Sequence, residues 1–193
     1  MIIAYHIVFT TYGTWLPNDP RGSFSKQIYN QKLAIVAPIK YGRQEDLPNK
    51  GDLRNFWTEA SGQIKRKSYF IDENARQVIA NSFSKTIKGY NLIVPACAIM
   101  NDHIHILVLS TKYKIGFIVN QLKSTATKNL NLKDTPWTEG YWKVFIYNRG
   151  NITICNKIHQ FKSCFCRDAS TALGLYSFKF ELIPRLERRC GNG

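Results

Sequence analysis

Residues 90–110, YNLIVPACAIMNDHIHILVLS, decide the fold of this chain. Two apolar, β-branched runs, 90–100 and 103–110, flank the polar pair Asn101-Asp102. This pattern predicts two antiparallel strands joined by a tight turn, because such runs favour strands and short polar pairs favour hairpin turns.

A helix is predicted on each side of this hairpin. Asp72 can cap a helix that runs through Lys88, because apolar residues recur there at spacings of three and four, and Gly89 would end it. The same period predicts a second helix over residues 115–131, with a basic opposite face.

Two outer strands complete the predicted order. Residues 4–12 and 137–147 are rich in β-branched and aromatic side chains, and a third helix is predicted over 151–161. The order strand, helix, strand, strand, helix, strand predicts an α+β, ferredoxin-like antiparallel sheet with helices on one face.

Two segments do not fit this order. Residues 23–67 mix proline, glycine and charges without a sustained period, which predicts a long insertion with little regular structure after the first strand. The tail, 163–193, holds three cysteines without a clear period, and the sequence assigns it no fold. We therefore expect one domain over 1–162, with the insertion inside it, and a tail of aberrant character.

The charge balance points to a polyanionic partner. Lysine and arginine number 27 against 13 acidic residues, a net charge of +14, which favours nucleic acid first and an anionic membrane surface second. The longest apolar run, 92–100, is far shorter than the roughly 20 residues of a spanning helix. An odd number of cysteines, five, and the absence of a signal-peptide pattern lead us to expect a cytoplasmic protein with reduced thiols.

The chemistry is expected at His103 and His105. Positions i and i+2 of a strand point the same way, so both imidazoles would share one face. Paired imidazoles can bind a divalent ion that polarises a phosphoryl oxygen. The alternative is a half-exposed strand with two incidental histidines, since so short a pattern needs a third ligand from elsewhere.

Several segments together carry a family resemblance. MNDHIHILV at 100–108 resembles the Met-Pro-Asn-His-hydrophobic-His core of the single-tyrosine HUH transposases, the IS200-like group that includes the REP-associated tyrosine transposases. AYHIVFTTYGTWLPNDPRGS is similar to that family's first strand and loop, IVNQLKSTATKNLN to its second helix and WTEGYWKVF to its fourth strand. The resemblance covers about residues 1–22 and 75–152.

The resemblance implies a DNA transposase that is both an endonuclease and a strand transferase. Such enzymes hold single-stranded DNA at a folded hairpin, bind magnesium or manganese through two histidines, here His103 and His105, and work as homodimers. Their tyrosine attacks a phosphate, leaving a 5′-phosphotyrosine and a free 3′-hydroxyl. This covalent intermediate keeps the energy of the broken bond for rejoining the strand.

The nucleophile is where this sequence departs from the family. The family carries Tyr-x-x-x-Asn or Tyr-x-x-x-Gln on its third helix, which should fall near residues 158–160, and no tyrosine occurs there. Tyr147 and Asn151 reproduce the spacing, so Tyr147 is the leading candidate, with an ordinary strand aromatic as the alternative. Further candidates are Tyr176, Tyr141 and His159. A frameshifted or decayed gene beyond Ile152 would explain both the missing tyrosine and the unusual tail.

Basic residues near the second helix are candidates for DNA contact. Residues 103–133 contain no acidic side chain, and their lysines can neutralise phosphates without sequence preference. The expected DNA-binding residues are Lys112, Lys114, Lys123, Lys128 and, from the first loop, Arg21. A solvated helix face is the alternative.

Three functions remain open from the sequence. The first is the metal-dependent transposase, and the second is a catalytically inactive or decayed relative that binds DNA hairpins without cleavage. The third is an anion-binding ferredoxin-like module in which the histidines are incidental. Structural zinc is not expected, because the cysteine spacing matches no ribbon or finger.

Overall fold

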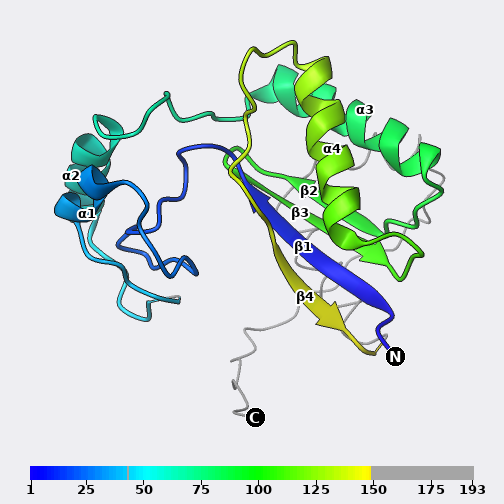
Figure 1. Cartoon of the computed structure of the whole chain (residues 1–193), viewed down its shortest axis with the longest axis horizontal. Coiled ribbons are helices and arrows are strands. Elements are labelled where there is room, and N and C mark those ends of the chain that lie inside the picture. The colour runs from blue at the N-terminus through cyan, green and yellow to red at the C-terminus, as the bar shows by residue number, and fades with distance from the viewer. Residues whose placement is uncertain (43, 149–193) are drawn as a thin grey trace.

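The computed structural model describes residues 1–42 and 44–148. The predicted third helix at 151–161, the tail and the candidates Tyr176 and His159 lie outside the described residues. The described elements are, in chain order, β1 (Ala4–Thr10), α1 (Gln31–Val36), α2 (Lys50–Ser61), α3 (Glu73–Gly89), β2 (Ala96–Ile99), β3 (His103–Leu109), α4 (Ile115–Asn129) and β4 (Trp142–Ile146) (Figure 1).

The four strands form one antiparallel sheet in the order β2-β3-β1-β4. The helices α3 and α4 lie side by side over one face of this sheet (Figure 1). This is the ferredoxin-like arrangement, so the predicted fold class and the long insertion after β1 are confirmed.

Local signals explain where the two long helices begin and end. The Asp72 side chain accepts a hydrogen bond of 2.8 Å from the main-chain N–H of Ala75, as the capping prediction requires. The helix α3 ends at Gly89, but Gly89 is itself helical, and the left-handed residue that follows the helix is Asn91 at φ 50°. The helix α4 ends at Asn129, and Asn131 at φ 53° makes the corresponding turn.

The strands are shorter than their apolar runs, for identifiable reasons. Pro95 has no N–H to give to a ladder, and β2 begins just after it at Ala96. Gly140, at φ 74°, separates the isolated bridge of Trp137 from β4. The hairpin turn is as predicted, since the N–H of Met100 donates to the carbonyl of His103 at 2.9 Å.

The two faces of the sheet carry different residues. Ile7, Phe9, Ile104, Ile106 and Val108 pack under the two helices in the main core. The alternate residues Ala4, Leu107 and Ile146 form a smaller buried cluster on the other face. Because successive strand residues alternate between faces, His103 and His105 lie on the face turned away from α3 and α4.

The prediction of little regular structure in residues 23–67 is wrong. This insertion contains α1 and α2, which pack together around Leu16, Leu33, Phe56 and Ala60 to one side of the sheet (Figure 1). The overlooked signal is the cap of α2, where the Asn49 side chain accepts from the N–H of Asp52 at 2.9 Å. The apolar residues that follow recur at helical spacing over only three turns, Leu53, Phe56, Trp57 and Ala60.

Among residues 1–42 and 44–148, no helix has both the length and the apolar character needed to cross a membrane.

Candidate functional site

Two histidines of β3 form the centre of the candidate site. His103 and His105 are both half-buried, and their ring centroids are 4.8 Å apart with the planes at 77°. Ile104, between them, is fully buried in the main core and holds the strand in this register. The structure therefore brings the two predicted ligand residues together on one face.

The orientation of His103 is set by the residue before it. Its Nδ1 lies 2.5 Å from Oδ1 of Asp102. A carboxylate can only accept, so Nδ1 carries the proton and Nε2 is left with its lone pair. The hydrogen bond from His103, with a smaller contribution from the nearby charge of Arg21, outweighs burial and lowers the pKa of Asp102, which keeps it ionised.

A third histidine joins the pair from β1. Nε2 of His6 lies 3.0 Å from Nδ1 of His105, and the two rings stack with centroids 5.2 Å apart at 17°. Sequence reasoning assigned His6 no role in the site. The sequence carries no signal for this contact, because it depends on the pairing of Val8 with His105, which brings His6 next to His105 on the same face.

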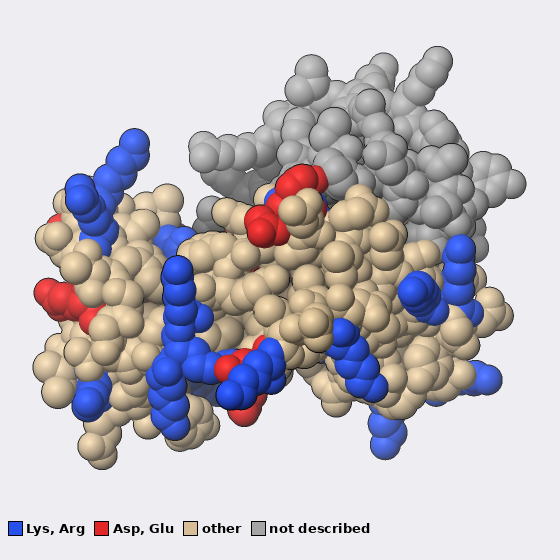
Figure 2. All heavy atoms as spheres, turned by 90° about the horizontal axis from the view of Figure 1, so that it is seen from above, with Lys and Arg blue, Asp and Glu red and all other residues tan. Residues whose placement is uncertain are grey.

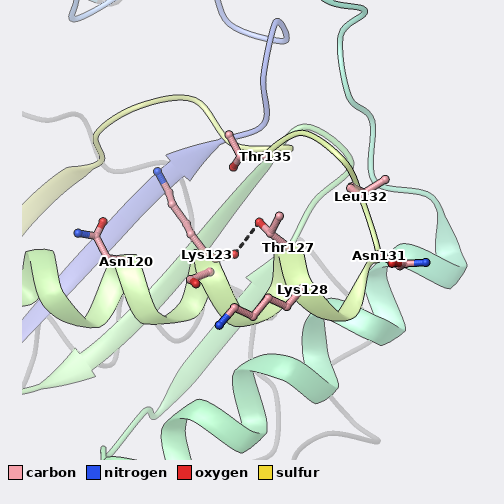
Figure 3. A pocket seen from close by; sticks show the side chains of 8 residues that line it. Asn120, Lys123, Thr127, Lys128, Asn131, Leu132 and Thr135 are labelled. Carbon is pink, nitrogen blue, oxygen red and sulfur yellow. Dashed lines mark hydrogen bonds between the residues drawn. The ribbon is translucent and has the colours of Figure 1, made fainter.

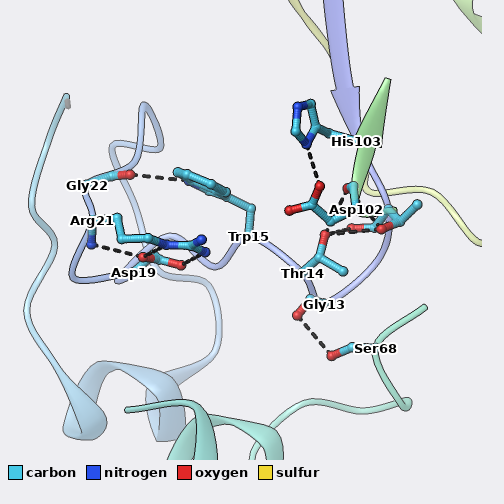
Figure 4. A network of polar contacts seen from close by, with 10 residues as sticks. Gly13, Thr14, Trp15, Asp19, Arg21, Gly22, Ser68, Asp102 and His103 are labelled. Atoms are coloured by element: carbon cyan, nitrogen blue, oxygen red, sulfur yellow. Dashed lines mark hydrogen bonds and ion pairs between the residues drawn. The ribbon is translucent and has the colours of Figure 1, made fainter. Parts of the chain in front are cut away.

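The loop after β1 holds the turn that carries Asp102. The main-chain carbonyl of Asp102 accepts from the N–H of Thr11 at 2.9 Å and is 3.0 Å from the Thr11 hydroxyl and 3.1 Å from that of Thr14. Both threonines are buried. Figure 4 shows this network beside the Asp102–His103 pair. Thr11 and Thr14, at the start of this loop, therefore fix the backbone beneath the histidine site.

Arg21 lies in the same loop and is held by an ion pair. Its Nε and Nη2 donate to the two carboxylate oxygens of buried Asp19 at 2.9 and 2.7 Å (Figure 4). The guanidinium also lies 4.1 Å from the ring centroid of Trp15. The bond to Asp19 raises the pKa of Arg21. Much of the arginine's hydrogen-bonding capacity is thus used to shape the loop.

The donor set fits a partial metal site. Imidazole nitrogens suit borderline ions, and a carboxylate on the second ring nitrogen is the usual support for a metal-bound histidine. Within the described ranges, no three His, Cys, Asp or Glu side chains are arranged to hold an ion together. Further ligands would have to be water, a phosphate oxygen or a group from the rest of the chain.

The predicted basic residues divide into two kinds. Lys112, Lys114 and Lys128 are exposed at the two ends of α4. Lys123 instead donates to the carbonyls of Thr138 and Gly140 at 2.8 and 2.6 Å. Burial lowers the pKa of Lys123 to about 8. Lys123 therefore ties the loop before β4 to the helix.

A shallow groove of about 620 Å³ runs along α4 next to this lysine. Figure 3 shows Lys123 and Lys128 over the helix, with Thr135 on the facing loop. Figure 2 shows lysine and arginine side chains spread over one side of the molecule, with few acidic ones among them. This charge distribution suits a phosphate backbone.

Tyr147 does not join the histidines within one chain. It follows β4, whose last residue, Ile146, pairs with Ala4, while His105 and His103 pair with Val8 and Thr10. Four to six residues at about 3.3 Å each separate these positions, roughly 13–20 Å along the sheet. Tyr147 is 62% exposed there. Tyr141 is half-buried against the main core.

These features define a class of protein: a ferredoxin-like α+β domain with a histidine cluster on one face of its sheet and a basic surface. Residues 62–157 match the family model described as "Transposase IS200 like", about half of the chain. The chain belongs to this family of IS200-like transposases.

Two solved structures are similar to the chain. The chain is similar to a REP-associated tyrosine transposase solved bound to a REP hairpin, with 10% identity over 96% of this chain and 93% of that one and a TM-score of 0.51. At that identity the likeness shows the shared fold. A candidate transposase from Deinococcus radiodurans aligns with 12% identity over 85% and 94% of the two chains and a TM-score of 0.42. None of the curated proteins matches the chain.

Proposed function

We propose that this transposase cuts and rejoins single-stranded DNA with the help of a divalent metal, magnesium or manganese, bound at His103 and His105. The observation that carries the proposal is the carboxylate of Asp102 on Nδ1 of His103, beside a second imidazole on the same face. A carboxylate on the second ring nitrogen is the usual partner of a metal-bound histidine, because it fixes the ring's tautomer and orientation.

The protein's own residues prepare this site. Asp102 keeps the proton on Nδ1 of His103, so Nε2 can donate its lone pair to an ion. His6 holds the ring of His105 through Nδ1. A bound divalent ion would stabilise negative charge on the phosphoryl oxygens. Because imidazole is a softer donor than the oxygens that magnesium prefers, manganese should bind more tightly.

The proposed DNA substrate is a hairpin with single-stranded flanks. Support comes from the net charge of +14, from the exposed lysines Lys112, Lys114 and Lys128, and from the solved relative that carries a REP hairpin. Lysine contacts to phosphates are strongly salt-dependent and carry no base preference. Arg21 and Lys123 would act mainly by holding the loops that border the DNA, since two side-chain hydrogen bonds of each already go to loop residues.

The proposed nucleophile is a tyrosine. Its phenolic oxygen would lose a proton and bond to phosphorus as the bond to the leaving 3′-oxygen breaks, which yields a 5′-phosphotyrosine and a free 3′-hydroxyl. Tyr147 lies too far from the histidines of its own chain, so it would act on the site of a second copy in a homodimer. Tyr176 is the alternative from the part of the chain beyond the described residues.

The displacement of Tyr147 also favours a second candidate function. A relative that keeps the fold and the basic surface but has no tyrosine at the histidine site would bind hairpin DNA without cutting it. Both candidates bind DNA, and only the first forms a covalent protein–DNA bond.

The test is a search for that bond. The full chain is incubated with manganese and a labelled hairpin oligonucleotide with single-stranded flanks, and the products are separated on a denaturing gel. An adduct that is lost in His103→Ala and mapped by peptide analysis to one tyrosine supports the transposase chemistry. Tyr147→Phe separates Tyr147 from Tyr176. Salt-sensitive binding by folded protein without any adduct would favour the inactive relative.

A further inference from the structure

Three exposed aromatic rings meet between the insertion and the sheet. Phe24 and Tyr41 come from the insertion and Trp142 from β4, and they are 60%, 58% and 43% exposed. The Phe24 and Trp142 rings are nearly parallel, with centroids 6.0 Å apart at 22°. Tyr41 meets Phe24 edge-on, also at 6.0 Å. We refer to these three residues as the aromatic cluster.

The insertion holds two of these rings in place with a short backbone bridge. The N–H of Ser23 donates to the carbonyl of Lys40 at 2.9 Å, and the N–H of Gly42 donates to that of Ser23 at 2.8 Å. Gly22 adopts φ 92°, and a Cβ there would lie 1.9 Å from the carbonyl oxygen of Gly42. Only glycine permits this approach, so the backbone that presents Phe24 and Tyr41 is closely specified.

The aromatic cluster borders the histidine site. Trp142 and His105 both pair with Val8, from opposite sides, so they lie in one row across the same face. Trp142 and His105 are two strand spacings apart, about 10 Å, which is comparable to one or two nucleotides of extended single strand. The edge of Trp142 also meets the ring of His6, with centroids 6.5 Å apart at 82°.

The chemistry of the aromatic cluster favours a nucleobase as its ligand. Exposed flat rings beside positive charge are the usual platform for unpaired bases, because every base has a face that can stack. Lys26 supplies such a charge, with its ammonium 6.0 Å from the Tyr41 centroid. The chain as a whole is strongly basic, which disfavours a basic protein partner and favours a polyanion.

We propose that the aromatic cluster of Phe24, Tyr41 and Trp142 stacks an unpaired base of the single strand that enters the histidine site. The inference rests on the proposed function and adds a role for the insertion, which would position the strand next to the scissile phosphate.

The test compares three oligonucleotides on the full chain. One is a blunt DNA hairpin, and the other two are the same hairpin with a four-nucleotide adenine flank on the 5′ side or on the 3′ side, with 2-aminopurine in the flank. Wild type should bind one of the flanked hairpins at least about fivefold more tightly than the blunt one, with quenched 2-aminopurine fluorescence.

Variants of the aromatic cluster sharpen this comparison. Phe24 is exposed, so Phe24→Leu should fold as the wild type does. This variant should lose most of the affinity that the flank adds, and Phe24→Trp should keep that affinity. Tyr29→Leu is the matched control, because Tyr29 is a 90% exposed aromatic of the same insertion.

Three results would overturn the stacking site. If the flank adds no affinity while the blunt hairpin binds, the aromatic cluster does not stack a base and the hairpin proposal stands. The same conclusion follows if Phe24→Leu keeps the full gain. If the wild-type chain binds none of the oligonucleotides, the proposed function and the stacking site are refuted together.

Discussion

Removal of the Asp102 carboxylate is the most informative perturbation of the histidine site. In Asp102→Ala, Nδ1 of His103 loses the acceptor at 2.5 Å, and the ring becomes free to rotate and to change tautomer. Loss of such a supporting group typically lowers metal affinity 10- to 100-fold, about 1.4–2.7 kcal/mol. Asp102→Asn keeps an acceptor of the same shape without the charge, so the metal affinity of this variant should fall less than that of Asp102→Ala.

The assay is a calorimetric titration of manganese into the full chain without DNA. His103→Ala serves as the reference for loss of a ligand. The backbone of the turn should survive in both Asp102 variants, because the Asp102 carbonyl still accepts from Thr11 and Thr14. Circular dichroism and urea unfolding check this before each titration.

Two results would contradict this prediction. If Asp102→Ala binds manganese as tightly as wild type while His103→Ala does not, the carboxylate does not orient the ligand. If His103→Ala also binds as wild type does, the histidine pair is not the metal site at all.

Three further predictions concern stability. Thr14→Val should lower the free energy of unfolding in urea by about 1 kcal/mol, because one buried hydroxyl proton and its hydrogen bond are lost; an unchanged midpoint would contradict the network at Asp102. Phe56→Ala should destabilise the helices of the insertion by about 3 kcal/mol and speed amide exchange at residues 50–61, while strand amides stay protected. The pKa of Lys123, lowered to about 8 from 10.5, means that the folded state binds fewer protons than the unfolded state between these values. The free energy of unfolding should therefore gain a contribution that rises with pH above about 8, and the difference between wild type and Lys123→Met across this range should reveal it.

The elements that were predicted correctly depend on local patterns. The hairpin over 90–110 and the helices α3 and α4 have long, regular apolar periods with a recognisable turn or cap, and they formed nearly where expected. The helices of the insertion were missed because α1 spans only six residues and α2 twelve. Over so few turns, a helical period is difficult to distinguish from an irregular mixture of polar and apolar residues.

The sequence by itself determined the ferredoxin-like fold and the common face of His103 and His105, because both follow from the two-residue period of a strand and the order of the elements. Only the tertiary structure decided which other residues meet there. His6 joins the site, Tyr147 is displaced from it, and Lys123 turns its ammonium to two backbone carbonyls. These outcomes depend on the register between β1 and its two neighbouring strands and on loop packing, which are set by contacts between residues about a hundred positions apart.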